Sequence, residues 1–567
     1  MLKKIACLTA FSLIATLAPA KTSAQTREAA PRPPKLVLQI TVDQLRGDLP
    51  FRFADRFSKG GFRRFLDRGL WYAAAHHDHA YLETIVGHTT LATGAWPSRH
   101  GMIANRWYDA KTGQGVENIE DSRYPILSIA GETPSGKGVS PTAILTTTFS
   151  DELTITTAGR AKVFAVSVKD RGAVPMSGHA GKAFWYSEQN GCFVTSSFYY
   201  SAYPQWVTDW CGKHLADAYA NTKWELSEDR SRFLFRDVTN VYPAGSRAEE
   251  NMASLDSLGF GRTFPHPLSS GADLYRNLTL SPPGDELTAA FAKELIRQEA
   301  LGKDTVTDFL AISFSITDYI GHWYSTTSLE SEDNLLRLDR TLQSLLDFVD
   351  AEVGLDHTLV VLSGDHGGAE YPEYLATLNV NTGRIPMQDI SAAANQAVSD
   401  KYGTTDKIIS SYSQPYLYVD RAVLEKNKLN LAEVERVIAD AVQAVPGIAV
   451  AVPILQLTNG GGQGDEELLA RLRHNYNRER SGDVQVLQLP QWQIDGDSGP
   501  KLLQHASLWA YDSFVPVAFL GPRVPTAMIY RSISTTDVAA TLSSYLKTKF
   551  PSGNVGMPLV EVVRGRE

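Results

Sequence analysis

The chain has 567 residues, of which 43% are hydrophobic and 21% are charged. This composition is typical of globular proteins and excludes collagen-like, low-complexity and wholly disordered chains. The 54 Lys and Arg residues against 63 Asp and Glu residues give a formal charge of -9, and no long basic block stands out, so we expect no nucleic-acid polymer as a partner.

The amino terminus has the pattern of a secretory signal peptide. Lys3 and Lys4 precede an apolar run, residues 5–17, which is too short for a stable membrane anchor. Small residues follow at positions 18, 20, 23 and 24 and offer cleavage points. We predict a signal peptide over residues 1–24 and a Pro-rich lead-in over 25–34, with an uncleaved anchor as the alternative. No other segment is apolar enough to cross a membrane, so we expect a periplasmic or secreted protein without membrane contact after cleavage.

The cysteines agree with export. Cys7 lies in the predicted signal peptide, which leaves Cys192 and Cys211. A disulfide between these two would close a loop of about 20 residues and stabilise the fold by about 3 kcal/mol. Secreted proteins form such bridges, so we predict the disulfide, with two free buried thiols as the alternative.

Short apolar runs that end in polar or glycine residues recur along the rest of the chain. They cover residues 36–42, 163–168, 309–315, 358–362 and 515–520, with helical patterns over 286–300 and 331–353. Apolar strands that alternate with helices predict an α/β fold with a mainly parallel central sheet and helices on both faces. The stretches at about 180–285 and 370–500 do not show this alternation of strands and helices. We predict that they are insertions over the strand ends, within a single domain over residues 35–567.

Acidic and histidine side chains gather where the predicted strands end, which is the edge that holds ligands in such sheets. Five candidate metal ligands share this placement, namely Asp43, Asp318, His322, Asp365 and His366, and a sixth, His505, lies shortly before the last predicted strand. The i, i+4 spacing of Asp318 and His322 places both on one helix face. Carboxylate and imidazole ligands without thiolate suit Zn²⁺, and six of them suffice for two ions with open positions for substrate. Each residue alone could instead be a helix cap or a turn residue, but their joint placement favours a metal site.

A second cluster follows the first predicted strand. Thr84 and His88, then Thr93-Gly94, then His100-Gly101 to Asn105, match the pattern Thr-x-x-Gly-His, Thr-Gly and His-Gly-x-x-x-Asn. With the ligand motifs in the same order, this pattern resembles the alkaline phosphatase superfamily. It is most similar to bacterial zinc-dependent alkaline phosphatases that use a Thr nucleophile, within the nucleotide pyrophosphatase/phosphodiesterase branch. The resemblance spans residues 40–520 approximately.

The resemblance implies two Zn²⁺ ions and a role for each matching residue. Thr84 would be the nucleophile. One ion would be held by Asp43, Asp365, His366 and the Thr84 hydroxyl, and the other by Asp318, His322 and His505. At His505 the chain departs from the family pattern, because Ala506 stands where a Gly is usual.

Three further residues would bind the substrate phosphate, namely Asn105, Lys169 and Arg171. Lys169 and Arg171 lie two residues apart beyond a predicted strand, so their side chains point the same way if the chain stays extended. Spacing alone is equally compatible with a solvated charged turn. In the family branch that cleaves monoesters, this Lys-x-Arg-Gly pair binds phosphoryl oxygens. The chemistry fits, because a monoester dianion carries one more charge than a diester and Arg can bind two oxygens at once.

The implied activity is the hydrolysis of small phosphate monoesters through a phosphothreonine intermediate, since Zn²⁺ lowers the pKa of a bound hydroxyl. Three alternatives remain. A phosphodiesterase or nucleotide pyrophosphatase could use the same site, although Lys169 and Arg171 argue against it as the main activity. A sulfatase would need a Cys or Ser that is oxidised to an aldehyde, in place of Thr84. A non-catalytic binding protein would not need a nucleophile, six ligands and oxyanion donors together.

Three other motifs have simpler explanations. Residues 131–138 nearly match a P-loop, but Gly138 stands where a Ser or Thr would bind Mg²⁺. The histidines at positions 76, 77 and 79 are expected to pack or to orient ligands rather than to form a metal site of their own. Asp483, in the sequence Arg-Ser-Gly-Asp, echoes a family motif to which the sequence assigns no role.

Overall fold

The computed structural model describes residues 33–129, 137–459, 465–496 and 503–564. All of these belong to one unit, residues 33–567, which is called the second unit below. The predicted signal peptide and most of the P-loop-like motif lie outside the described residues. None of the helices in the four described ranges has the length and apolar character needed to cross a bilayer.

A nine-stranded sheet forms the centre of the second unit, in the order β21-β2-β20-β13-β1-β12-β7-β8-β9. Its strands are β1 (Leu36–Val42), β2 (Leu70–His76), β7 (Val163–Ser167), β8 (Lys182–Tyr186), β9 (Phe193–Val194), β12 (Asp308–Phe314), β13 (Thr358–Gly364), β20 (Phe514–Leu520) and β21 (Ala527–Ser534). Only β20 and β9 are antiparallel to the strands they pair with, so the prediction of a mainly parallel sheet is confirmed. All five predicted strands are present, with ends shifted by at most two residues.

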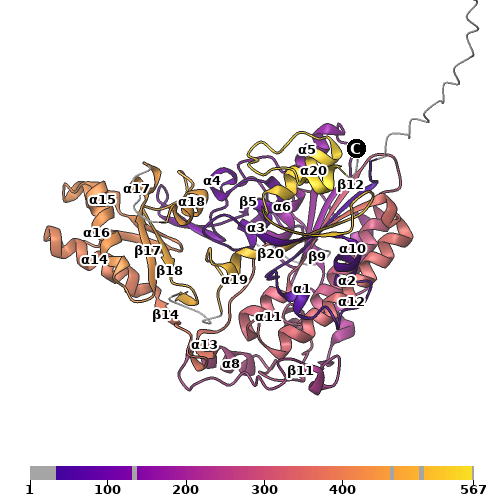
Figure 1. The fold of residues 1–567 in the computed structure, drawn as a ribbon, viewed down its shortest axis with the longest axis horizontal. Helices are drawn as coiled ribbons and strands as arrows, with labels where there is room; N and C mark the ends of the chain where they lie inside the picture. Colours follow the sequence, from indigo (N-terminus) through magenta and orange to yellow (C-terminus); the bar gives the residue numbers. More distant parts are fainter. Residues whose placement is uncertain (1–32, 130–136, 460–464, 497–502, 565–567) are drawn as a thin grey trace, which may run out of the picture. The chain divides into compact units, whose positions relative to one another are not determined.

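Helices cover both faces of this sheet, as predicted (Figure 1). On one face lie α1 (Leu49–Arg52), α2 (Phe62–Arg68), α10 (Pro283–Gln298), α11 (Ile316–Tyr324) and α12 (Leu329–Glu352). On the other lie α3 (Thr84–Thr93), α5 (Phe149–Thr156), α6 (Asp170–Ser177) and α20 (Asp537–Leu546). Side chains alternate along β1: Leu38 and Ile40 pack against the first set, whereas Val37 packs against the second.

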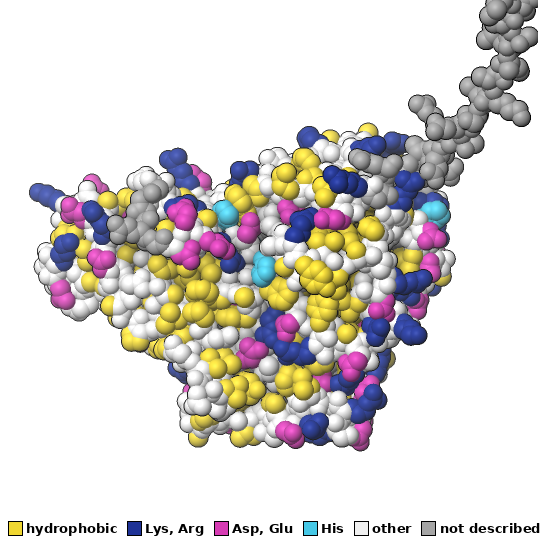
Figure 2. All heavy atoms as spheres, in the orientation of Figure 1, with side chains coloured by type: hydrophobic (Ala, Val, Ile, Leu, Met, Phe, Trp, Pro, Cys, Tyr) yellow, Lys and Arg dark blue, Asp and Glu magenta, His cyan; other side chains and the backbone are white. Residues whose placement is uncertain are grey.

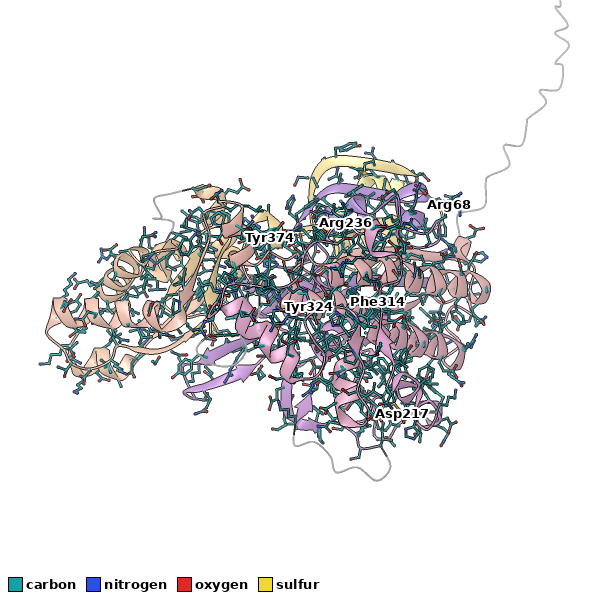
Figure 3. The ribbon with its side chains drawn as sticks, turned by 90° about the horizontal axis from the view of Figure 1, so that it is seen from below. Arg68, Asp217, Arg236, Phe314, Tyr324 and Tyr374 are labelled. Carbon is teal, nitrogen blue, oxygen red and sulfur yellow. A yellow bond between two sulfur atoms is a disulfide. The ribbon has the colours of Figure 1, made fainter. Side chains whose placement is uncertain are left out.

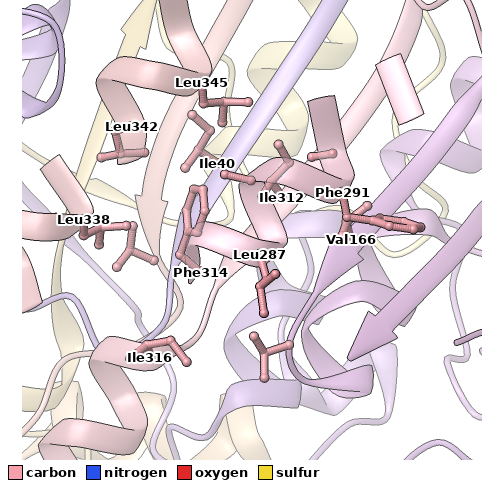
Figure 4. Close-up of a cluster of buried hydrophobic side chains, with 14 of the residues drawn as sticks. Ile40, Val166, Leu287, Phe291, Ile312, Phe314, Ile316, Leu338, Leu342 and Leu345 are labelled. Atoms are coloured by element: carbon pink, nitrogen blue, oxygen red, sulfur yellow. The ribbon is translucent and has the colours of Figure 1, made fainter. Parts of the chain in front are cut away.

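The core under the first set of helices shows how the strands are held in place. Ile40 of β1 and Ile312 of β12 meet Phe291 of α10 and Leu342 of α12 (Figure 4). All four side chains are buried, and each such burial contributes about 1.5–3 kcal/mol to folding. Apolar packing along their length therefore holds the strands in place, and polar residues can stand at their ends, where the candidate site lies.

The stretch 180–285 begins inside the central sheet, because β8 and β9 extend it. The run Lys182–Tyr186 is rich in aromatic residues, which favour strands. The rest of this stretch comprises α7 (Gln205–Cys211), η1 (Leu215–Tyr219), β10 (Lys223–Trp224), η2 (Arg230–Arg232), α8 (Arg247–Ser257), β11 (His266–Pro267) and α9 (Ala272–Leu278). Cys192 and Cys211 form a disulfide, with their Cα atoms 5.5 Å apart, which ties the edge of the sheet to α7.

The stretch 370–500 has a four-stranded sheet of its own, in the order β15-β16-β18-β17, and a separate apolar core that includes Val434 and Ile438. Its elements are α13 (Pro372–Thr377), β14 (Gly383–Pro386), α14 (Met387–Tyr402), β15 (Ile409–Ser413), β16 (Tyr416–Val419), α15 (Arg421–Lys426), α16 (Leu431–Gln443), β17 (Ile448–Pro453), α17 (Ile454–Thr458), α18 (Glu466–Asn475), β18 (Val484–Gln488) and β19 (Trp492–Asp495). Asp483 has a structural role here, because its carboxylate accepts a hydrogen bond of 2.7 Å from the Val419 amide and pairs with Arg421.

The remaining elements are small: α4 (Pro97–His100), β3 (Arg106–Asp109), β4 (Gln114–Glu117), β5 (Glu120–Pro125), β6 (Gly138–Val139), η3 (Leu355–His357), α19 (Ala510–Ser513) and α21 (Val560–Val563). On the face drawn in Figure 2, basic and acidic side chains are interspersed, without a large patch of one sign.

Candidate active site

Three neighbouring parallel strands end level with one another and carry most of the predicted ligands. Val42, the last residue of β1, pairs with Phe314 of β12 on one side and with Gly364 of β13 on the other. Asp43 follows β1 directly, Asp365 and His366 follow β13, and Asp318 and His322 lie on α11 just beyond β12. The strand register therefore brings together residues that are up to 323 positions apart in the chain.

All six predicted metal ligands meet at this edge. Ligand atoms of Asp43, Asp365 and His366 lie within 4.8 Å of one another, and so do those of Asp318, His366 and His505. His366 thus belongs to both groups. His322 lies next to the second of these groups, because its Nε2 is 3.3 Å from Asp318 Oδ2.

The three histidines all present the same nitrogen to these carboxylates. Each Nδ1 donates to a backbone carbonyl: that of His366 to Gly367 at 2.9 Å, that of His505 to Leu82 at 2.6 Å, and that of His322 to Leu503. This fixes the tautomer, so that Nε2 carries the lone pair. A backbone partner on the distal nitrogen is the usual support of a metal-binding histidine.

The polar atoms at the centre of the site fit a metal centre. Asp43 Oδ1, Asp365 Oδ2 and His366 Nε2 are buried and have no hydrogen-bond partner within the described part of the chain. Buried carboxylate oxygens without partners are costly, and bound cations are a common way to satisfy them. The donor set, carboxylates and imidazoles without thiolate, suits zinc and similar ions.

Thr84 is the first residue of α3 and is buried. Its hydroxyl accepts a hydrogen bond of 3.3 Å from Lys169 Nζ, beside the carboxylate groups. The amino end of a helix carries partial positive charge, which favours an anion at this position. The other threonines of the helix, Thr89, Thr90 and Thr93, donate to carbonyls one turn earlier and are engaged in the helix itself.

Lys169 and Arg171 lie on the same side of the site, but the backbone conformation that places them there differs from the predicted one. The chain is extended only to Lys169 and turns into α6 at Asp170, so Arg171 lies in the first helical turn. The assumption of a continuing extended chain is therefore wrong, because Asp170 begins a helix that packs on β7 and β8. Both side chains nevertheless line the same cavity.

The two cations differ in their surroundings. Lys169 Nζ lies 2.6 Å from Asp43 Oδ2 and also contacts Asp318 Oδ2. Burial alone would lower the pKa of Lys169, but the charges of these two carboxylates outweigh it and raise the pKa above its usual value. Arg171, in contrast, makes no ion pair with any described residue, and its Nε is buried without a hydrogen-bond partner. An anion that enters the site would find the Arg171 guanidinium available.

Asn105 is held at the start of α3, next to Thr84, by contacts with Glu83 and Ile85. The Asn105 backbone amide donates to Glu83 Oε2, and Asn105 Oδ1 accepts from the Ile85 amide at 3.3 Å. With its oxygen engaged at the start of α3, the Asn105 side chain has its amide nitrogen left to donate. The predicted role as a donor to a phosphate oxygen is thus compatible with its contacts.

Two residues around the ligands, Gln44 and His88, had no predicted role. Gln44 donates from its backbone amide to Asp365 Oδ1 at 3.1 Å and from Nε2 to Asp318 Oδ1 at 2.9 Å, so it connects the ends of two strands. Its φ of 60° lies in the left-handed region. His88 places Nδ1 3.1 Å from Asp365 Oδ2 and Nε2 2.8 Å from Ser313 Oγ. His88 belongs to the recognised motif, whereas Gln44 offered no signal beyond following Asp43.

The three early histidines do not form a metal site of their own. Both ring nitrogens of His77 face hydrogen-bond partners, the Thr535 hydroxyl at 2.9 Å and the Gly364 carbonyl at 3.4 Å. His79 likewise contacts the Tyr81 carbonyl and the Thr90 hydroxyl.

The position after His505 explains why a glycine is usual there. Ala506 has a φ of 94°, in the region that glycine adopts without steric cost. The chain needs this turn to bring His505 Nε2 to within 3.5 Å of Asp318 Oδ1. The departure from the family pattern therefore strains the backbone but leaves the histidine in place.

Comparison with known proteins places this geometry in context. Residues 37–512 match the family described as type I phosphodiesterase / nucleotide pyrophosphatase. Alkaline phosphatase PafA of Elizabethkingia meningoseptica is 32% identical over 549 residues, which cover 95% of this chain and 96% of that protein. A protein named calcium-transporting ATPase, from Myroides odoratus, is 32% identical over 539 residues, 94% of this chain and 95% of that one. The crystal structure of wild-type PafA matches with a TM-score of 0.85 and covers 94% of this chain and 100% of that chain.

Proposed function

The chain belongs to the family of type I phosphodiesterases and nucleotide pyrophosphatases, and we propose that within it the protein is an alkaline phosphatase that hydrolyses small phosphate monoesters. The observation that carries this proposal is that Lys169 bonds the Thr84 hydroxyl and lines one cavity together with Arg171. A monoester has two negative charges on its phosphoryl group, and a guanidinium without an ion pair is suited to bind the additional oxygen.

We further propose that the metal centre is a pair of zinc ions. Asp43, Asp365, His366 and the Thr84 hydroxyl would hold one ion, and Asp318, His322 and His505 the other. When bound, such ions lower the pKa of a hydroxyl ligand and stabilise the charge on departing oxygens. Asp43 Oδ1, which is buried without a hydrogen-bond partner in the described part of the chain, and the shared tautomer of the three histidines support this assignment.

The residues around the phosphoryl group then have separate roles in its transfer. Thr84 Oγ, once deprotonated, attacks phosphorus while the bond from phosphorus to the ester oxygen breaks, and the alcohol leaves after it takes up a proton. Water then cleaves the phosphothreonine into free Thr84 and inorganic phosphate. Lys169 already donates to this oxygen and stabilises the negative charge that it develops. Arg171 and Asn105 bind the remaining phosphoryl oxygens, where charge is spread in the transition state. The start of α3, rigidly packed on the sheet, holds the nucleophile in position.

Export of the protein is part of the proposal. The signal-peptide pattern at the amino terminus and the disulfide between Cys192 and Cys211 both support a periplasmic or secreted location, because such bridges persist in oxidising compartments.

The test compares three substrates with purified protein and added Zn²⁺: an aryl phosphate, a bis-aryl phosphate and an aryl sulfate. We expect aryl phosphate turnover to dominate at alkaline pH. Replacing Lys169 and Arg171 together by alanine should reduce monoester cleavage more than diester cleavage. Equal losses on both substrates would refute the assigned role of the pair and favour the second candidate, a phosphodiesterase or nucleotide pyrophosphatase, which the family match itself suggests.

The nucleophile and the metals are tested with one variant. Thr84→Ala should abolish turnover while the protein still binds close to two zinc ions per chain by elemental analysis. Full residual activity would place the nucleophile elsewhere. Activity that survives chelation, or a metal content of one ion at most, would refute the two-metal site.

A further inference from the structure

A cavity of about 350 Å³ adjoins the two phosphate-binding cations. Its volume lies in the range of sites that bind small molecules. Lys169 and Arg171 line the cavity, and so does the turn between β8 and β9. Because Glu188 and Gln189 in this turn are exposed, we call the turn the rim of the cavity. A monoester with its phosphoryl group on Arg171 would therefore extend its alcohol part into this space.

Hydrogen bonds and a disulfide hold the turn at the rim of the cavity in place. The turn is closed by the Ser187 amide, which donates to the Cys192 carbonyl at 2.8 Å, and by the Gly191 amide, which donates to Ser187 at 2.9 Å. Cys192 is tied in turn to α7 by its disulfide with Cys211. Glu188 in this turn lies with its Oε1 3.4 Å from the Thr279 hydroxyl, and both residues line the cavity.

Charge is distributed unevenly along the cavity. Among the described residues that line it, Lys169 and Arg171 are the only cations. Lys169 is paired with Asp43 and Asp318, whereas Arg171 makes no ion pair with a described residue. Two carboxylates also line the cavity, those of Asp170 and Glu188. Asp170 accepts a hydrogen bond of 2.7 Å from the Arg171 amide, whereas Glu188, at the rim, forms no ion pair with a described residue. Arg276 of α9 is paired with Asp273, although its charge also acts to lower the pKa of Glu188.

The rest of the lining suits a neutral alcohol that carries hydroxyl groups. Trp185 and Tyr319 offer aromatic surface, and Gln189, Ser187 and Thr279 offer groups that can exchange hydrogen bonds with hydroxyls. A carboxylate such as that of Glu188 accepts hydrogen bonds from hydroxyls but repels a second anionic group.

We propose that this cavity is the leaving-group subsite of the enzyme, that it takes phosphate monoesters of neutral, hydroxyl-bearing alcohols, and that Glu188 disfavours alcohols that bear a second anionic group. The inference rests on the proposed phosphatase function, which supplies the position of the phosphoryl group. Glu188 is here a specificity-determining residue and takes no part in the chemical step.

The experiment compares two substrates that differ only in charge at the far end, glycerol phosphate and phosphoglycerate. We measure kcat/KM for both with the zinc-loaded wild-type enzyme and with Glu188→Gln, which removes the charge and keeps the shape. The preference for glycerol phosphate should fall by about tenfold in Glu188→Gln, since like charges in proximity cost at least about 1.4 kcal/mol. In the wild type, this preference should also weaken as salt is added, because the rim is exposed and its charge is screened.

Two further variants make the result specific. Glu188→Asp keeps the charge and should keep most of the preference. Asp217→Asn removes a negative charge from the same region, but Asp217 lies at the surface outside the cavity, with its side chain half exposed and bonded to Tyr275 (Figure 3). It should leave both substrates unchanged.

The outcomes separate the subsite from the function. If the wild type hydrolyses aryl phosphate and the preference is the same in Glu188→Gln, the subsite assignment is refuted while the phosphatase function stands. The same holds if Asp217→Asn changes the preference as much as Glu188→Gln does, because the effect would then be long-range. Failure of the zinc-loaded wild type on aryl phosphate would refute the proposed function, and the subsite with it.

Discussion

Lys169 should stabilise the metal-free protein far more than the metal-loaded one. Its Nζ lies 2.6 Å from Asp43 Oδ2 and also contacts Asp318, and all three side chains are at most 1% exposed. Lys169→Met keeps most of the apolar stem and removes the charge. In the metal-free protein, two buried carboxylates then lose their cation, and breaking such a buried pair costs about 3–5 kcal/mol.

Bound metal changes this result. Under the proposed assignment, Asp43 and Asp318 are ligands of different zinc ions, which supply positive charge whether or not Lys169 is present. The same substitution should then cost about 1 kcal/mol, the worth of an ordinary hydrogen bond. The prediction is thus a difference between two states of one variant, which general damage to the fold would not produce.

Urea unfolding measures both costs. The chain has 10 Trp residues, so fluorescence reports unfolding, with excess chelator in one series and excess Zn²⁺ in the other. Lys303→Met is the matched control: Lys303 pairs with Glu352 at the surface and should change stability by less than about 0.5 kcal/mol in both series. An equal loss for Lys169→Met with and without metal would refute the link between this lysine and the metal ligands.

Three other predictions concern the support of the site and of the sheet. Ala506→Gly should raise the free energy of unfolding by about 1 kcal/mol in urea melts, because it relieves a φ of 94°; no gain would mean that this backbone is unstrained. Gln44→Asn, which shortens the amide that bonds Asp318, should weaken zinc affinity about 10–100-fold in a chelator competition, and unchanged affinity would contradict the supporting role of Gln44. The hydrogen bond that His179 donates to the Asp151 carboxylate raises the pKa of His179, so this interaction stabilises the fold below the ordinary histidine pKa and is lost as pH rises through the raised one. His179→Gln should therefore destabilise the protein more at about pH 6 than at about pH 9, and a pH-independent loss would refute the assignment.

The sequence was sufficient for those parts of the site that are local. Asp43 and Asp365 each follow an apolar strand, and Thr84 begins a helix, so short windows carry the signal. The level ends of three parallel strands then bring these residues together without further information. The main local error, at Arg171, arose because a helix begins one residue after Lys169 and the polar run before it gives no strong helix signal.

What the sequence could not supply is the set of long-range contacts that orient the ligands. The carbonyl of Leu82 fixes His505 across 423 positions, and the carbonyl of Leu503 fixes His322 across 181. Any residue has a backbone carbonyl, so no side-chain pattern marks these partners. The same is true of Gln44, whose role depends on a left-handed backbone and on two strands that are distant in sequence.

The charges gathered at the strand ends make a monoester the best-balanced substrate of the proposed site. Asp43, Asp318 and Asp365 bring three buried carboxylates, against the two cations Lys169 and Arg171. Two divalent ions would turn this single negative surplus into three positive charges. A phosphate monoester contributes two negative charges and a deprotonated Thr84 hydroxyl one more, so the site becomes neutral only with that substrate. A diester would leave one positive charge uncompensated in a buried site, and its binding is weaker for that reason. Without Arg171 the site holds one positive charge fewer, so a diester rather than a monoester would leave it neutral. The ratio of monoester to diester turnover therefore tests the assignment more directly than either rate alone.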